Sequence, residues 1–323
     1  MSNIKLGVTL YCFTKEYCDK RLSFEDCVRL CAEMGVNGYE IVATQMIPSY
    51  PYVSDEFLGL VNRLKAEYGI APVCYAANTD MGMRFDRDLN DEELFSSTLR
   101  DLKSANKLGC KVMRSQYLLS PQVLVKIAPY AEMYDVKVGI EIHNPETPST
   151  PKMLEYYDAI VTSKSKYIGF VPDLGAFANK PNIDSYEGAL ERGANKAMLD
   201  YAVKLRYDEV PMAVAQKELE NKGADPEVMK AFFNNYGFLT FYTHPDYEGL
   251  KKILPYCFEI HGKFHHMLPN GTERSIPYEE IIPILKDNNY NGYIISEYEG
   301  HARNNAVEMV GKHISMMKRL LAE

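Results

Sequence analysis

The chain has 323 residues, of which 46% are apolar and 25% are charged, a composition typical of a globular protein. Its net charge of −8 opposes binding to a phosphate backbone, so we expect no nucleic-acid partner. No apolar segment reaches the ~18 residues that a membrane span needs, and the residues after Met1 do not resemble a signal peptide. We therefore expect no membrane partner and a cytoplasmic location. The seven cysteines are scattered without a C-x-x-C pair, which indicates free thiols.

Short apolar segments alternate with longer amphipathic segments along the whole chain. The apolar segments predict strands at residues 5–13, 38–43, 70–77, 110–117, 136–143, 167–175, 257–264 and 292–300. The amphipathic segments predict helices at residues 23–35, 54–69, 90–109, 120–135, 150–163, 275–289 and 304–322. This order indicates an α/β fold, a (β/α)8 TIM barrel that forms a single domain over residues 1–323. An open doubly wound sheet is the alternative, but no G-x-G-x-x-G motif follows a strand to support it.

One interval between strand ends is too long for a simple strand–helix unit. From Asp173 to His261 there are 88 positions (261 − 173). The interval before it, from Glu141, spans 32 positions (173 − 141), and the interval after it, to Glu297, spans 36 (297 − 261). The additional residues, about 176–245, predict a helical insertion between strands six and seven. Because the insertion follows the carboxyl end of a strand, we expect a wall or a partner-docking surface over the barrel mouth.

Polar side chains end the last four predicted strands of the barrel. They are Glu141, Asp173, His261 and Glu297. The carboxyl ends of parallel strands meet at one mouth, so these side chains should converge there. Without a cation the three carboxylates would repel one another, whereas Mn²⁺, Mg²⁺ or a similar ion accepts this set of ligands. Such an ion keeps about two positions open for neighbouring substrate oxygens. Pairing of the carboxylates with basic residues at the rim is the alternative.

The motifs "GIEIHNP", "FVPDLG", "FEIHGK" and "ISEYEG" carry a resemblance to a known family. The chain resembles, over nearly its whole length, the xylose isomerase-like superfamily of metal-dependent sugar isomerases and epimerases. This resemblance implies that the four strand-end residues are the metal ligands. Two positions depart from the ketose epimerases of the superfamily, which often have His where this chain has Ala176 and Asp where it has Phe264. The nuclease members carry additional His ligands on strands two and three that are absent here, which argues against a nuclease.

A narrower resemblance rests on "EIHNP", "IHGKFHHM" and "ISEYEGH". These segments are similar to the α subunit of bacterial C-glycoside deglycosidases, which cleave the carbon–carbon bond between a 3-oxo sugar and a flavonoid-type aglycone. The resemblance implies a metal-dependent lyase that acts through a metal-stabilised enediolate. It also implies Mn²⁺ as the cofactor, with Mg²⁺ or Co²⁺ as alternatives, and a small β subunit in a hetero-oligomer. A ketose isomerase or epimerase is the second hypothesis, and a non-catalytic scaffold subunit is the third.

Several residues beside the proposed ligands are candidates for catalysis. His143 follows Glu141 by two residues, so it shares that face of the strand, and an imidazole can move protons near neutral pH. We therefore predict His143 as the acid/base residue, with a structural role as the alternative. Lys263 and Glu297 are the other catalytic candidates. His265 shares the face of Lys263 and is a predicted substrate-binding residue. The alternatives are a carboxylate-paired Lys263 and a place in the loop for His265 and for its neighbour His266.

Three further residues complete the predicted site. Arg114 ends strand four and either binds a substrate oxygen or braces a ligand carboxylate, of which we favour bracing. Tyr298 and His301 follow Glu297 closely, and we expect them to line the rim, Tyr298 in contact with the substrate.

Overall fold

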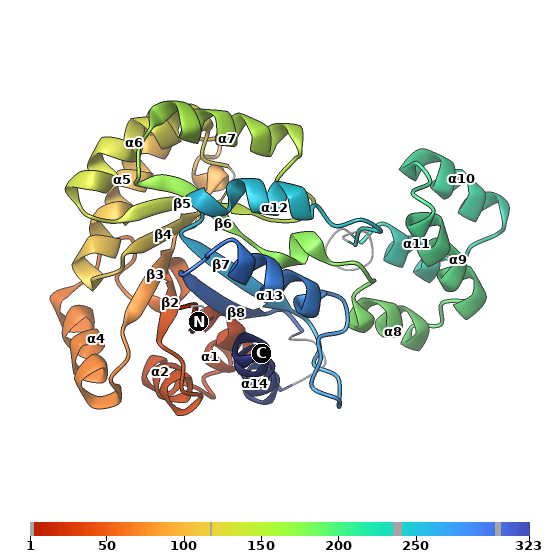
Figure 1. The fold of residues 1–323 in the computed structure, drawn as a ribbon, viewed down its shortest axis with the longest axis horizontal. Helices are drawn as coiled ribbons and strands as arrows, with labels where there is room; N and C mark the ends of the chain where they lie inside the picture. The colour runs from red at the N-terminus through yellow and green to blue at the C-terminus, as the bar shows by residue number, and fades with distance from the viewer. Residues whose placement is uncertain (1–2, 117, 235–240, 301–304) are drawn as a thin grey trace.

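The computed structural model describes residues 3–116, 118–234, 241–300 and 305–323 (Figure 1). Eight strands form one parallel sheet in the order β6-β5-β4-β3-β2-β1-β8-β7. The strands are β1 Lys5–Thr9, β2 Gly38–Val42, β3 Pro72–Ala76, β4 Val112–Ser115, β5 Lys137–Ile142, β6 Ile168–Pro172, β7 Glu259–Phe264 and β8 Tyr293–Tyr298. Parallel bridges from Phe170 to Cys257 and from Asp173 to His261 join β6 to β7. The sheet therefore forms a nearly closed barrel, which confirms the predicted (β/α)8 fold.

Helices connect the strands and cover the outside of the barrel (Figure 1). The crossover helices are α2 Phe24–Glu33, α4 Asp55–Tyr68, α5 Asp91–Leu108, α6 Pro121–Met133, α7 Pro151–Ser163, α12 Tyr247–Ile253, α13 Tyr278–Asp287 and α14 Ala306–Ala322. Short helices lie in the connections: η1 Leu10–Phe13, α1 Thr14–Cys18, α3 Ala43–Met46, η2 Met81–Met83, η3 Leu174–Phe177 and η4 Leu254–Tyr256. No helix within the described residues combines the length and apolar character needed to cross a membrane.

Local signals in the sequence set the ends of these helices. The side chains of Ser23 and Asp26 form a capping box at the start of α2, so two backbone N–H groups that lack a partner within the helix are satisfied. Asn90 and Glu93 do the same for α5. That helix ends at Gly109, whose φ of 81° lies in the left-handed region that glycine adopts without steric cost.

Within its described residues, the long connection between β6 and β7 forms four helices before the crossover helix α12, besides the short η3. They are α8 Ile183–Glu191, α9 Lys196–Tyr207, α10 Met212–Asn221 and α11 Pro226–Phe232. Their apolar faces pack into a separate core that includes Leu199, Leu219 and Phe232. In Figure 1 these helices extend to one side of the barrel, beyond α12 and α13. The predicted helical insertion is therefore confirmed, and α12 follows it as the crossover helix that leads into β7.

A buried carboxylate on α5 gives a prediction about stability. Asp101 is only 3% exposed, and Tyr75 donates a hydrogen bond to it over 3.2 Å. Burial raises the pKa of Asp101 to about 6, above the value near ~3.9 of an unfolded chain. The folded protein therefore binds more protons between these two values, so Asp101 weakens the fold progressively as the pH rises through this window.

We expect Asp101→Asn to stabilise the fold at pH 7 by about 1–3 kcal/mol, since a shift of one pKa unit corresponds to about 1.4 kcal/mol. The gain should vanish at about pH 3, below both pKa values, where the carboxyl is largely protonated in the folded and the unfolded state. Urea unfolding at the two pH values measures this difference. The exposed Asp88→Asn is the matched control and should change nothing. Equal unfolding midpoints for Asp101→Asn and the native chain at pH 7 would contradict the prediction.

Candidate metal centre

Strand β7 brings three polar side chains into the barrel. Side chains alternate along a strand, so Glu259, His261 and Lys263 share one face. All three are at most 2% exposed. His261 lies between a carboxylate of β5 and a carboxylate of β8, and Lys263 lies nearer the mouth of the barrel beside the end of β6. A strand that places charged groups in a closed interior requires charge partners there.

Glu141 on β5, His261 on β7 and Glu297 on β8 converge at the carboxyl ends of their strands. His261 Nδ1 lies 3.1 Å from Glu141 Oε1 and 3.2 Å from Glu297 Oε2. One ligand atom from each residue can be chosen so that all three lie within 4.8 Å of one another. His261 Nδ1 makes no hydrogen bond to any described residue. Buried polar atoms normally have partners, so the two carboxylate oxygens that gather around this nitrogen fit a shared cation.

Arg114 on β4 lies against this cluster. Its Nη1 donates a hydrogen bond to Glu141 Oε2 over 3.2 Å, and the guanidinium is buried. Burial by itself would raise the pKa of Glu141, but Arg114 and then His261 outweigh it and lower that pKa to about 2. Arg114 therefore holds Glu141 ionised and in place, the bracing role that we favoured. Its predicted contact with substrate stays a prediction.

Asp173, the remaining predicted ligand, pairs with a lysine. Its Oδ2 lies 3.0 Å from Lys263 Nζ, and its Oδ1 accepts a hydrogen bond from the backbone of Gly175 over 2.7 Å. Its backbone pairs with that of His261, so the two side chains start from neighbouring positions. The carboxylate is not part of the group that converges around His261 Nδ1. Its role as a fourth ligand stays a prediction.

Lys263 links the cluster to the outer part of the mouth. Its Nζ lies 3.4 Å from Glu297 Oε2 and 2.9 Å from Glu299 Oε1. Burial opposes the charge on this lysine, but Asp173 and then Glu297 outweigh the effect and raise the pKa of Lys263 well above its usual value. The side chain is therefore a buried ammonium group. Its pairing with carboxylates matches the alternative that the sequence left open, and a catalytic role stays a prediction.

His143 lies beside Lys263 at the end of β5. Its Nδ1 lies 2.9 Å from the carbonyl oxygen of Asn144, which can only accept, so Nδ1 carries the proton of the neutral ring. Its Nε2 then accepts from Lys263 Nζ at 3.4 Å, and the same nitrogen lies 3.7 Å from Asp173 Oδ2. The structure therefore places a basic imidazole nitrogen at the barrel mouth, as the position of His143 predicts. Its part in proton transfer stays a prediction.

The other predicted residues lie in different surroundings. His265 lines a cleft beside Glu299, and burial lowers the pKa of His265 to about 4, so its ring is neutral. His266 contacts Asp184 of α8 at 3.4 Å. Tyr298 is fully buried, and its hydroxyl donates to the carbonyl of Gly300 over 2.6 Å. We therefore leave Tyr298 out of the proposed substrate-binding residues.

The position of Tyr298 has a simple cause. Glu297 faces the barrel interior, so the next side chain along β8 faces the outer helices, where the ring of Tyr298 packs on Phe264 at 5.2 Å. His301 lies outside the described residues.

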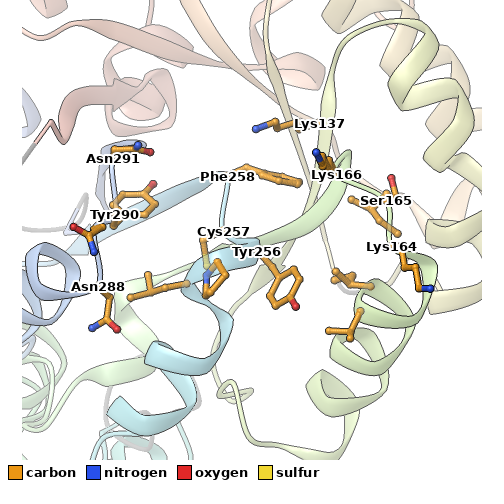
Figure 2. A pocket seen from close by; sticks show the side chains of 16 residues that line it. Lys137, Lys164, Ser165, Lys166, Tyr256, Cys257, Phe258, Asn288, Tyr290 and Asn291 are labelled. Carbon is orange, nitrogen blue, oxygen red and sulfur yellow. The ribbon is translucent and has the colours of Figure 1, made fainter.

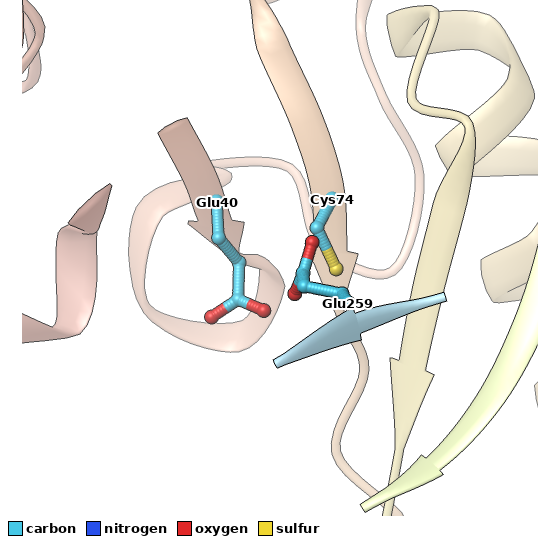
Figure 3. Close-up of side chains that lie close together, drawn as sticks. All are labelled: Glu40, Cys74 and Glu259. Atoms are coloured by element: carbon cyan, nitrogen blue, oxygen red, sulfur yellow. The ribbon is translucent and has the colours of Figure 1, made fainter. Parts of the chain in front are cut away.

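The sequence analysis missed a second group of buried polar side chains. Glu40 on β2, Cys74 on β3 and Glu259 on β7 offer ligand atoms within 4.8 Å of one another (Figure 3). Glu40 Oε2 lies 3.1 Å from His261 Nε2, and Glu259 Oε1 lies 3.6 Å from it. Burial raises the pKa of Glu259 to about 7. A single charged residue in the apolar segment GYEIVA is the signal in the sequence that could have revealed Glu40.

Two cavities lie at opposite ends of the barrel. A cleft of about 460 Å³ lies between α8 and the mouth, where Asp184 and Arg192 face His265 and Glu299. The insertion therefore forms one wall beside the mouth. A cavity of about 620 Å³ lies at the opposite, amino-terminal ends of β5 to β7 and is lined by lysines such as Lys137 (Figure 2). The length of the barrel separates it from the cluster.

Comparison with known proteins agrees with the fold. A model of the xylose isomerase-like TIM-barrel family matches residues 28–320. The chain is 30% identical over 334 residues to the 3'-dehydrocarminate deglycosidase alpha subunit of Microbacterium sp, covering 99% of this chain and 96% of that protein. It is also 30% identical over 338 residues to a C-glycoside deglycosidase alpha subunit of Arthrobacter globiformis, covering 100% and 94%. The solved structure of the IOLI protein with a bound zinc atom has a TM-score of 0.60 at 14% identity, covers 99% of this chain and 98% of that one, and shows the fold alone.

The chain belongs to the xylose isomerase-like TIM-barrel family. Its similarity over the full length places it, within that family, among the relatives of the C-glycoside deglycosidase α subunits. Those relatives are named as enzymes that act on glycosides, and their description as α subunits implies that they assemble with a second subunit.

Proposed function

We propose that the protein is a divalent-cation-dependent lyase that cleaves the carbon–carbon glycosidic bond of 3-oxo-C-glycosides. The observation that carries the proposal is the convergence of Glu141, His261 and Glu297 at the barrel mouth. It occurs in a chain that is similar over its whole length to deglycosidase α subunits. Two carboxylates and an imidazole suit Mn²⁺, with Mg²⁺ or Co²⁺ as alternatives.

The polar residues at the mouth suit the removal of a proton next to a carbonyl group. When bound, the cation would polarise the 3-oxo group and make the proton on C2 of the sugar more acidic. His143 would take this proton at Nε2, because its Nδ1 already donates to Asn144. The ammonium group of Lys263, 3.4 Å from that nitrogen, would stabilise the negative charge that develops on the substrate oxygen.

Bond cleavage then needs no oxidant or reductant. The electron pair released at C2 forms the C1–C2 double bond while the bond from C1 to the aglycone breaks. The electrons of the broken bond stay on the aglycone carbon, which must gain a proton. His143 in its protonated form can return one to it. The aglycone would lie in the cleft between α8 and the mouth, whose volume of about 460 Å³ falls in the usual range for small-molecule sites.

The test is an assay on the purified protein together with a small partner subunit and Mn²⁺. A 3-oxo-C-glucoside should release its aglycone, and removal of the cation by a chelator should stop the release. A panel of free ketoses tested in parallel covers the second hypothesis, an isomerase or epimerase. That hypothesis is favoured by the same placement of His143, since both reactions begin with transfer of a proton next to a carbonyl. Ketose conversion without aglycone release would replace the lyase proposal.

The insertion offers a surface for the proposed partner subunit. On α10 and directly after α11, the side chains of Met212, Val214 and Phe233 are 39%, 48% and 42% exposed. We expect Val214→Arg to reduce co-purification of the small subunit at least tenfold, because a charge would be buried at the contact. Val125→Arg, at an exposed apolar position on α6, is the control. Equal recovery of the partner with both variants would rule out docking on α10.

A further inference from the structure

The imidazole of His261 lies between two pairs of carboxylates. On the side of the mouth, Nδ1 is 3.1 Å from Glu141 and 3.2 Å from Glu297. On the inner side, Nε2 is 3.1 Å from Glu40 and 3.6 Å from Glu259. The ring has no exposed surface. Each nitrogen therefore meets only acceptor groups, although a neutral imidazole carries a single N–H.

The two nitrogens differ in their hydrogen bonding. His261 Nε2 has hydrogen-bond geometry toward Glu40 Oε2. His261 Nδ1 makes no hydrogen bond to a described residue, although two carboxylate oxygens lie within 3.2 Å of it. These oxygens surround the nitrogen but do not lie along the direction of an N–H bond. Ligands that share one metal ion with a nitrogen are arranged in this way. The geometry therefore favours the tautomer with the proton on Nε2 and the lone pair on Nδ1.

The barrel holds Glu40 rigidly for this contact. It lies on β2, where every residue is buried, and the parallel register sets it beside Thr9 on β1 and Cys74 on β3. The side chain has no exposed surface, and Arg114 is near enough to attract its charge. A buried carboxylate is costly unless it has such partners. Glu40 is thus fixed by the strands on both sides, independently of the loops at the mouth.

We propose that Glu40 is a positioning residue for the metal ligand His261, an inference that rests on the metal-dependent function proposed above. By accepting a hydrogen bond from Nε2–H, Glu40 fixes the tautomer that turns a lone pair on Nδ1 toward Glu141 and Glu297. A carboxylate in this place also fixes the orientation of the ring and increases its strength as a ligand. Loss of such a partner commonly weakens metal affinity by about 10–100-fold.

The alternative interpretation is that Glu40, Cys74 and Glu259 bind a separate cation (Figure 3). The hydrogen bond between Glu40 and His261 favours the positioning role, because the carboxylate oxygen that faces the ring already accepts a hydrogen bond from it. The two readings differ in stoichiometry. Positioning requires one cation per chain, whereas a separate site would bind a second one that disappears in Cys74→Ser.

The experiment compares Glu40→Met, Glu40→Gln and the matched control Glu259→Met on the full chain. Calorimetric titration with Mn²⁺ should show one cation per native chain, a 10–100-fold weaker affinity for Glu40→Met and a smaller loss for Glu40→Gln, which keeps an acceptor. Glu259→Met should retain nearly native affinity, since Glu259 makes no hydrogen bond to the ring. In ¹⁵N spectra of the Zn²⁺-loaded protein, the native ring should be protonated at Nε2, and this signature should change only in the Glu40 variants.

The outcomes separate this inference from the proposed function. If the native chain binds no divalent cation, the proposed metal centre itself fails. If it binds one cation but Glu40→Met keeps the same affinity and the same His261 tautomer, the positioning role is overturned while the metal centre stands. A second bound cation that is lost in Cys74→Ser also overturns it. Circular dichroism of each variant identifies a loss of affinity that comes only from misfolding.

Discussion

Glu297→Ala should lose the divalent cation and, with it, the activity. Glu297 Oε2 is one of two carboxylate oxygens within 3.2 Å of His261 Nδ1, and its removal leaves Glu141 and His261 as the converging ligands. Loss of an outer partner of a metal ligand already costs about 10–100-fold in affinity, so loss of a ligand should cost at least 100-fold. Metal analysis after gel filtration and the aglycone-release assay measure the two effects. Glu141→Ala should behave in the same way.

The matched control for this prediction is Glu299→Gln. Glu299 also lies at the end of β8 and also pairs with Lys263, at 2.9 Å, but it is not part of the converging group. We expect Glu299→Gln to retain the cation, so a common loss in both variants would indicate a general disturbance of the mouth. Full metal occupancy in Glu297→Ala would show that the cluster is held together by hydrogen bonds and ion pairs alone.

His143→Ala should keep the fold and the cation but lose turnover by about two to four orders of magnitude, the usual contribution of a positioned acid/base group. The reason is geometric. The Nδ1–H donates to Asn144, so Nε2 is the basic atom, and it faces the mouth beside Lys263. Single-turnover kinetics at saturating Mn²⁺ measures the loss. Chemical rescue by added imidazole would support proton transfer as its cause.

A control at a second histidine makes this result specific. His266 contacts Asp184 of α8, so His266→Ala should change turnover far less. If His143→Ala loses the cation, the residue supports the metal site instead. If it keeps both the cation and near-native turnover, it has no part in the chemistry, and Glu297, Lys263 and His265 become the next candidates.

The fold was predictable because its signals are local. Strands and helices alternate at regular intervals, and caps such as Ser23 and Gly109 mark helix ends in the sequence itself. The meeting of Glu141, His261 and Glu297 was predictable for a related reason, since all strands of a parallel barrel end at the same mouth. The outward orientation of Tyr298 was also predictable, because side chains alternate along a strand and Glu297 points inward.

Other features depend on how the barrel closes. Glu40 and Glu259 lie 219 positions apart in the sequence (259 − 40) and meet only inside the closed sheet, so no local pattern links them. The ion pair between Asp173 and Lys263 has the same origin, because it needs β6 and β7 side by side across the insertion. Long-range register, rather than residue type, decides these contacts.

The separate core of α8 to α11 has a consequence for how the proposed activity could diversify. Leu199, Leu219 and Phe232 pack against one another, while the backbone bridges between β6 and β7 hold the two strands together without them. Under the proposed function, the segment that lines the cleft can thus be replaced as one continuous cassette while the proposed cation ligands stay in register. Selection, or a designer who grafts helices from a relative, would in this way alter the aglycone that is accepted without rebuilding the proposed metal centre.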